Sequence, residues 1–193
     1  QSIELALSRT TSNQVETRWS DASTPTAPWQ KAQSDPSWAG ETIYKDYRDT
    51  IVDINPANLW ECIEEIGGET GWYGADFLWW ARGVLDRMVG GVGLRRGRRD
   101  PQFLRVGDSL DFWRVENISK EEHLRLYAEM ILPGKAWLEF NLKVVDGKTV
   151  VTQDALFAPR GLGGQIYWYL VSPFHFFIFP TMLRNIEKAA RKS

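Results

Sequence analysis

Residues 161–183 read GLGGQIYWYLVSPFHFFIFPTML and contain no Asp, Glu, Lys or Arg. An apolar stretch of this length is typical either of a membrane-spanning helix or of a helix buried at the centre of a globular domain. The two interpretations predict different functions, so this segment decides how the rest of the chain is interpreted.

The interior of this segment favours the buried helix. Pro173 and Pro180 interrupt helical hydrogen bonding, Ser172 and His175 are polar, and three glycines weaken its start. A transmembrane helix tolerates proline where neighbouring helices satisfy the freed carbonyl groups, so the membrane-spanning alternative stays open. We interpret Gly161–Leu183 as a long, kinked helix clasped by a curved sheet.

The composition excludes several classes of site. The chain has 193 residues, enough for one well-filled core, and its 23 Lys and Arg nearly balance its 25 Asp and Glu, which gives no indication of nucleic-acid binding. The single cysteine, Cys62, excludes an internal disulfide and favours a reducing compartment, so we expect a cytoplasmic protein. Only His123 and His175 accompany it, which excludes a zinc site built from Cys and His, and no metal is expected.

The first forty residues differ from the remainder. Ile3–Ser8 is typical of a helix end and Val15–Trp19 of a short strand. Residues 20–40 are rich in Ser, Thr, Pro and Ala, as linkers are. We therefore place a domain boundary near residue 40.

The next part predicts one strand and two helices. Strand-forming residues occupy Glu41–Ile54, and Asn55 and Pro56 then form a helix N-cap with proline at the first helical position. That helix ends near Ile66, before two glycines. Ala75–Val89 has apolar residues at three- and four-residue spacing and predicts a second amphipathic helix.

An antiparallel meander follows, with Asp146-Gly147 as a strong hairpin signal. Its predicted strands are Phe103–Glu116, Leu124–Leu132, Trp137–Asp146 and Thr149–Ala158. A strand, two helices, a meander and a long final helix are the order of a helix-grip fold, in which a curved antiparallel sheet surrounds the C-terminal helix. We predict an α+β domain with a cavity between that helix and the sheet.

Five blocks of the sequence resemble a known but uncharacterised domain. They are GWY (71–73), RGVLDR (82–87), GGVGLRRGRRD (90–100), DFWRVE (111–116) and AWLEF (136–140). That domain is found at the C-terminus of proteins whose N-terminal half resembles an NAD(P)-binding atypical short-chain dehydrogenase or sugar-nucleotide epimerase. It is itself similar to the START and polyketide-cyclase-like (SRPBCC) superfamily. The resemblance spans roughly residues 41–188.

The resemblance implies a fold, a domain division and a class of ligand, but no established reaction. Residues 41–193 would be the helix-grip domain, which in this superfamily mostly binds apolar small molecules. Residues 1–40, in which TRWSD (17–21) resembles the family's domain junction, would be the tail of a preceding dinucleotide-binding domain plus a linker. NAD(P) would bind that Rossmann-type domain, and no cofactor is expected in this one.

The loop after the second predicted helix holds a dense positive cluster, Arg95, Arg96, Arg98 and Arg99. Guanidinium groups bind carboxylates and phosphates in a bidentate manner, so the cluster is a candidate anion-binding site. The alternative is a solvated loop with ion pairs to nearby acidic side chains. The glycines of GVGLRRG (91–97) imitate a phosphate loop but follow a predicted helix, which argues against nucleotide binding.

Four titratable residues are weak candidates for catalysis: Glu129, Glu139 and Asp154 in predicted strands, and His175 in the final helix. A carboxyl group buried in the cavity without a partner would have a raised pKa, which suits a general acid or base. Strand alternation places Glu139 with Trp137, so the simplest interpretation is that it faces solvent. A lone histidine among phenylalanines is more often a hydrogen-bonded core residue, although His175 would lie near the cavity floor.

Aromatic residues are numerous, with 10 Trp, 9 Phe and 6 Tyr. Most must build the core, and a few are expected to contact a ligand. The candidates for the cavity wall are Trp72, Tyr73, Trp79, Trp80, Trp113, Trp137, Trp168 and Tyr169.

Three functions are open. The first is the binding of a small apolar ligand by the C-terminal module of an NAD(P)-dependent protein, whose Rossmann-type domain performs any redox chemistry. The second is an enzyme in its own right, a cyclase, hydratase or hydrolase that uses a cavity carboxylate. The third is a module that docks Gly161–Leu183 into lipid or a partner protein. We expect the first, without stable membrane insertion.

Overall fold

The computed structural model describes residues 42–68, 70–74, 83–84, 87–88, 90 and 98–192. The predictions for residues 1–40 and most of the predicted helix Ala75–Val89 lie outside the described residues.

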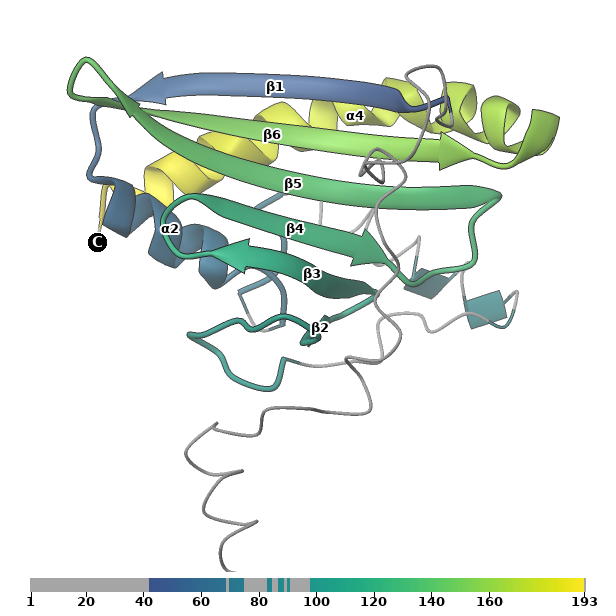
Figure 1. The fold of residues 1–193 in the computed structure, drawn as a ribbon, viewed down its shortest axis with the longest axis horizontal. Coiled ribbons are helices and arrows are strands. Elements are labelled where there is room, and N and C mark those ends of the chain that lie inside the picture. The colour runs from purple at the N-terminus through teal and green to yellow at the C-terminus, as the bar shows by residue number, and fades with distance from the viewer. Residues whose placement is uncertain are drawn as a thin grey trace, which may run out of the picture.

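A six-stranded antiparallel sheet forms the centre of the domain (Figure 1). The strand order is β1-β6-β5-β4-β3-β2, so the first strand pairs with the last one at the edge of the sheet. The strands are β1 (Tyr44–Val52), β2 (Ser109–Leu110), β3 (Trp113–Ser119), β4 (His123–Ala128), β5 (Gly134–Val145) and β6 (Lys148–Pro159). The predicted meander and α+β class are confirmed.

The helices α2 (Pro56–Glu64) and α4 (Gly161–Ala190) lie on the same face of the sheet and contact each other (Figure 1). Asn55 Oδ1 accepts a hydrogen bond of 2.9 Å from the Ala57 amide, as the predicted N-cap requires. Gly67, with φ +85°, follows the end of α2 in a conformation that suits glycine. The curved sheet and the long C-terminal helix together form the helix-grip fold.

Local turns set the register of the sheet. Asp146 and Gly147 both have positive φ, as in a type I′ turn, and join Val145 to Lys148. A β-bulge interrupts β3 at Glu116, between two residues that pair with β4. The bulge lets the strand bend and re-aims the side chain of this residue.

Several predicted boundaries are wrong. The strand predicted to end at Leu132 ends at Ala128, and the strand predicted to begin at Trp137 begins at Gly134. The predicted strand Phe103–Glu116 is divided, because Asp111 adopts φ +53° and turns the chain so that Leu110 pairs with Trp113. The final helix continues past its predicted end at Leu183 to Ala190, because the buried apolar spacing extends beyond the uncharged segment.

The core lies between the helices and the concave face of the sheet. Alternate residues of β4 and β5 point toward the helices, as strand geometry requires. The buried side chains that meet there include Leu124, Leu126, Leu138, Phe140 and Leu142 from the sheet, Leu59 and Ile63 from α2, and Met182 and Ile186 from α4.

The helix α4 is buried on one face only. His175, Phe179 and Met182 are buried on its inner face, whereas Leu170 is 67% exposed and Phe177 is 74% exposed. By length and composition α4 is apolar enough to cross a membrane, and only 28% of its most apolar stretch is buried. The expectation of a fully enclosed helix is therefore wrong for its outer face.

Candidate functional site

A cavity of about 50 Å³ lies between α4 and the strands beneath it. It is lined by Trp113 of β3, Ala155 and Phe157 of β6, and Trp168 and Phe179 of α4, among others. Sites for drug-sized ligands usually measure about 300–1,000 Å³. The predicted cavity is thus present at the expected place, but it is far smaller than such a site, because aromatic side chains fill most of the space.

The wall of the cavity is a set of stacked rings. Trp168 stacks on Tyr44 and on Phe157, with ring centroids 5.6 Å and 5.9 Å away. Tyr44 and Phe157 are paired across β1 and β6, so the indole covers both strands. His175 meets the Trp168 ring edge-on at 5.3 Å and lies 4.6 Å from the Phe179 ring. Movement of the Trp168 indole would therefore enlarge the cavity.

Three polar side chains converge beside this wall. His175 Nδ1 lies 3.6 Å from Asp46 Oδ2, and Arg48 Nε lies 2.8 Å from Asp46 Oδ1. The Arg48 guanidinium also lies over the ring of Phe176, 5.0 Å from its centroid. Asp46 and Arg48 alternate with Tyr44 along β1, which turns all three toward α4. An imidazole, a carboxylate and a guanidinium in this arrangement can bind a polar group or transfer a proton.

Gln153 adds a fourth polar side chain under α4. It is fully buried, is paired with Arg48 across the β1–β6 ladder, and donates from Nε2 to Met182 Sδ at 3.1 Å. Among the described residues its Oε1 has no hydrogen-bond partner. A buried amide oxygen in this state is a ready acceptor for a donor group that enters the interior.

Sequence reasoning missed Asp46, Arg48 and Gln153. The alternation Tyr44, Asp46, Arg48 is visible in β1, but the direction in which it faces depends on pairing with β6, more than a hundred residues away. His175 was predicted near the cavity floor and is found in the cavity lining.

Two of the predicted catalytic carboxylates form ion pairs and do not line the cavity. Arg114 Nε donates to Glu129 Oε1 at 2.5 Å, and Lys45 Nζ lies 3.0 Å from Asp154 Oδ1. Asp154 alternates with Gln153, which faces the core, so it lies on the opposite face of the sheet. Neither carboxylate is placed to act on a molecule in the cavity.

Glu139 also lies on that opposite face, but it does not face solvent as expected. It is only 8% exposed, and its Oε1 accepts a hydrogen bond of 2.5 Å from Arg125 Nε. Arg125 and Glu139 are directly paired across β4 and β5, which brings the two side chains together. The expectation of a solvent-facing side chain is wrong because this ion pair is buried.

Glu116, at the bulge of β3, was not predicted. Its Oε2 lies 3.9 Å from Arg125 Nη1, on the side of Arg125 not used by Glu139. Burial raises the pKa of the Glu116 carboxyl group, and the positive charge of Arg125 opposes part of this shift. No sequence signal locates a bulge of this kind.

The aromatic candidates divide into several groups. Trp113, Trp137 and Trp168 line the cavity, although the Trp137 ring packs on Tyr127, 5.6 Å away, in a separate cluster on the opposite face. Tyr169 is 65% exposed on the outer face of α4. Trp79 and Trp80 lie outside the described residues.

Trp72 and Tyr73 serve the core and the attachment of α4. The Trp72 ring stacks on Phe112, and its Nε1 donates to Asp111 Oδ2 at 2.9 Å. The Tyr73 carbonyl accepts a hydrogen bond of 2.7 Å from Asn185 of α4. Neither residue lines the cavity.

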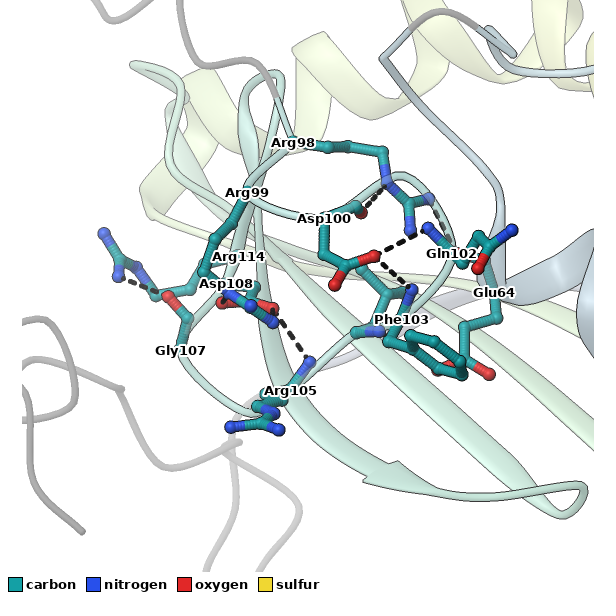
Figure 2. Close-up of polar contacts among 11 residues, drawn as sticks. Glu64, Arg98, Arg99, Asp100, Gln102, Phe103, Arg105, Gly107, Asp108 and Arg114 are labelled. Carbon is teal, nitrogen blue, oxygen red and sulfur yellow. Dashed lines mark hydrogen bonds and ion pairs between the residues drawn. The ribbon is translucent and has the colours of Figure 1, made fainter. Parts of the chain in front are cut away.

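Arg98 donates hydrogen bonds to backbone carbonyl groups at the end of α2 and in its own loop (Figure 2). Its Nη1 donates to the carbonyl groups of Glu64 and Ile66 at 2.6 Å and 2.8 Å, and its Nε donates to the Asp100 carbonyl at 2.9 Å. A cation at the C-terminus of α2 also opposes the negative end of the helix dipole. Its described contacts are therefore structural.

Arg99 has an equally structural contact (Figure 2). Its Nε and Nη2 each donate to Asp108 at 2.9 Å, in a bidentate pair, and Asp108 also accepts from the Arg105 amide. Arg95 and Arg96 lie outside the described residues. Arg99 thus makes an ion pair of the kind that the alternative expects, whereas Arg98 donates to backbone carbonyl groups.

Cys62 is buried in the core on α2. Over the described part of the chain, no group of three or more His, Cys, Asp or Glu side chains is placed to hold a metal ion.

A family comparison matches residues 38–182 to a family described as "Protein of unknown function (DUF2867)". The chain belongs to the DUF2867 family. No match was found among curated proteins.

Several solved structures resemble this DUF2867 domain at low sequence identity. DynU16, a putative protein in the dynemicin biosynthetic locus, has 12% identity and a TM-score of 0.43 over 74% of this chain and 47% of its own, so the chain spans about half of that protein. Protein NE0264 from Nitrosomonas europaea has 12% identity and a TM-score of 0.46, covering 77% of this chain and 94% of its own. Ara h 8.0201 has 10% identity and a TM-score of 0.42, covering 79% and 100%. At these TM-scores none of the similarities carries a functional assignment.

The predicted identity is therefore confirmed at the level of an uncharacterised family with a helix-grip fold. The preceding NAD(P)-binding domain has no support among these comparisons and stays a prediction. In the DUF2867 domain itself, the polar group around Asp46 and the aromatic cavity beside it are the features that suit a ligand.

Proposed function

We propose that this domain binds a small, largely apolar molecule between α4 and the concave face of the sheet. The observation that carries the proposal is the aromatic cavity under Trp168, with the His175–Asp46–Arg48 group at its side. Aromatic surfaces would hold the apolar body of the ligand, and the charged group would fix one polar end.

The size of the cavity requires that the ligand displace side chains. A space of about 50 Å³ does not hold a drug-sized molecule, so binding must move the Trp168 indole off the Tyr44 and Phe157 rings. The Trp168 side chain is only half-buried, so the indole can move toward solvent. Ligand binding and a change in the surroundings of Trp168 should therefore occur together.

The proposal is tested by ligand binding to the 193-residue chain. We expect a panel of hydrophobic carboxylic acids, phenols and ketones to contain compounds that raise the thermal midpoint, since a ligand that binds only the folded state stabilises it. Ala155→Trp fills the cavity from β6 and should abolish the shift. Val144→Trp, at an exposed position of β5, is the matched control and should leave it intact.

Two results would contradict the proposal. One is a panel without any compound that raises the midpoint of the wild-type protein. The other is an equal shift in Ala155→Trp, which would place the ligand elsewhere. Because Ala155→Trp risks overpacking, its folding is checked by circular dichroism, and Trp168→Leu provides a second variant in which compound affinity should change.

We further propose that redox chemistry belongs to a separate dinucleotide-binding domain of the full-length protein. In support, neither Arg98 nor Arg99 is available for a pyrophosphate in its present contacts. Titration of the chain with NADPH, followed by nicotinamide fluorescence, should give no saturable signal. A saturable signal would overturn this division of labour.

A second candidate function is catalysis by His175 as a general base. The observation that favours it is the 3.6 Å approach of Asp46 to the His175 imidazole in the cavity lining, because a carboxylate in this place can orient the ring of a histidine. This moves the enzymatic alternative from the sheet carboxylates to α4 and β1. Among the chain's two histidines, ¹⁵N NMR should show that a cavity ligand shifts His175 and leaves His123 unchanged; the reverse result would remove this candidate.

A further inference from the structure

The outer face of α4 forms an apolar stripe that the described part of the chain leaves exposed. Its side chains recur at helical spacing and are between 51% and 74% exposed. They are Leu162, Ile166, Tyr169, Leu170, Phe174 and Phe177. A contiguous run of large exposed apolar side chains marks an interaction surface in soluble proteins.

Charged side chains occur at the two ends of this stripe and nowhere within it. Arg160 precedes the helix and Arg184 follows the uncharged segment, and both are exposed. At 1.5 Å per residue the two lie roughly 36 Å apart along the helix axis. No acidic residue lies between them in the sequence. Basic residues beside an apolar helix face are typical of helices that lie on anionic membranes.

The packing of the inner face excludes a spanning arrangement. His175, Phe179 and Met182 are buried against the sheet side of the domain, and Gln153 of β6 donates to Met182. A bilayer around α4 would also enclose β1 and β6, and the outer edge of β1, which pairs with no other described strand, would then have no solvent for its backbone groups. The helix must therefore lie along a surface, with only its outer stripe in contact.

The charges favour lipid over a second copy of the chain. In an antiparallel pair of α4 helices, Arg160 of one copy would meet Arg184 of the other, and in a parallel pair each arginine would meet its equivalent. Like charges would be brought together in either case. In addition, the first turns of α4 project past the end of β6 (Figure 1), and a lipid surface accepts such a ridge without a complementary groove.

We propose that the outer stripe of α4 docks on an anionic lipid bilayer, with the helix axis parallel to the membrane plane and Arg160 and Arg184 at the headgroups. The apolar side chains enter the boundary between headgroups and acyl chains, and the sheet stays in water. This docking surface lies on the opposite side of α4 from the cavity, and it does not depend on a ligand there.

The test is co-sedimentation of the 193-residue protein with vesicles made of equal parts phosphatidylcholine and phosphatidylglycerol. The variant Leu170→Gln/Phe174→Gln/Phe177→Gln removes apolar side chains from the stripe and should bind at least roughly tenfold more weakly than wild type. The matched control, Ile51→Gln/Val144→Gln/Val145→Gln, removes equally exposed apolar side chains from β1 and β5 and should bind as wild type does.

A second variant tests the charges separately. Arg160→Gln/Arg184→Gln should lose the preference for phosphatidylglycerol over pure phosphatidylcholine vesicles, with an unchanged circular dichroism spectrum. The proposal is overturned if wild type does not bind either kind of vesicle, or if the stripe variant binds as tightly as wild type. It is also overturned if sedimentation equilibrium shows a wild-type dimer that the stripe variant dissociates, because the stripe would then be an interface between copies.

Discussion

The two faces of α4 have similar side chains and opposite surroundings. Phe177 and Phe179 are two residues apart, yet Phe177 is 74% exposed and Phe179 is 4% exposed. On most helices the polar residues mark the outer face, and here the segment has no charged residue to do so. Which face of α4 is buried is therefore decided by the contacts of the helix with the sheet and α2, and not by its own composition.

The largest expected effect separates these two phenylalanines. Phe179→Ala should lower the free energy of unfolding by about 3–5 kcal/mol, because it removes a buried ring and leaves a cavity next to His175 and Met182. Phe177→Ala should change it by less than about 0.5 kcal/mol, because that ring is exposed. Urea unfolding of both variants measures the difference. Equal losses would mean that the outer face is covered in solution.

The next effect concerns the start of the helix, where two adjacent glycines have different surroundings. A Cβ atom on Gly164 would lie 2.4 Å from the Pro133 carbonyl oxygen and 2.8 Å from Pro159, whereas one on Gly163 would meet nothing within 4 Å. Gly164→Ala should therefore cost about 1–3 kcal/mol through overpacking, and Gly163→Ala should gain about 0.5–1 kcal/mol in a helix. Thermal unfolding of the pair is the measurement, and a stabilised Gly164→Ala would show that α4 does not approach the β5–β6 end this closely.

Local signals explain how much of the fold was predictable. Asn55 and Pro56 begin α2, and the turn at Asp146 and Gly147 fixes the β5–β6 register, because each acts through backbone chemistry within a few residues. The division of the predicted strand at Asp111 was missed, because a non-glycine residue with positive φ has no reliable sequence signature.

The candidate site was less predictable because its parts meet across long distances in the chain. His175 was identified from its apolar surroundings, but its partner Asp46 lies on an edge strand, and the contact depends on the pairing of β1 with β6. The volume of the cavity depends on where the Trp168 ring stacks, which residue spacing does not determine. The placement of Glu139 was half right, since alternation gave its face but not its burial beside Arg125.

A smaller effect tests the polar contact of the inner face of α4. Asp46→Asn keeps the shape of the side chain and removes the charge that faces His175 and Arg48. Because this carboxylate is largely enclosed, we expect a loss of about 1–2 kcal/mol in the free energy of unfolding. Asp49→Asn, at an exposed position of the same strand, is the control and should change little. If both variants behave alike, the polar contact adds nothing to the attachment of α4.

The smallest effect concerns the face of the sheet that α4 does not cover, where charged side chains are buried beside the Trp137 ring. Burial raises the pKa of Glu116 above its value in the unfolded chain, so the folded state binds this proton more tightly. The stability that this proton contributes is fully present below the unfolded pKa and is lost as the pH rises through the folded pKa. Glutamine imitates the protonated form and leaves the 2.5 Å Arg125–Glu139 pair in place. Glu116→Gln should therefore match wild type in acid and become slightly more stable than wild type toward neutral pH.

Urea unfolding at several pH values measures the difference in stability between Glu116→Gln and wild type. Glu122→Gln, which changes an exposed carboxylate near the β3–β4 turn, is the control. A variant that is less stable than wild type at neutral pH would show that Arg125 needs both carboxylates, and that the buried charges on this face support the fold as the rings do on the other.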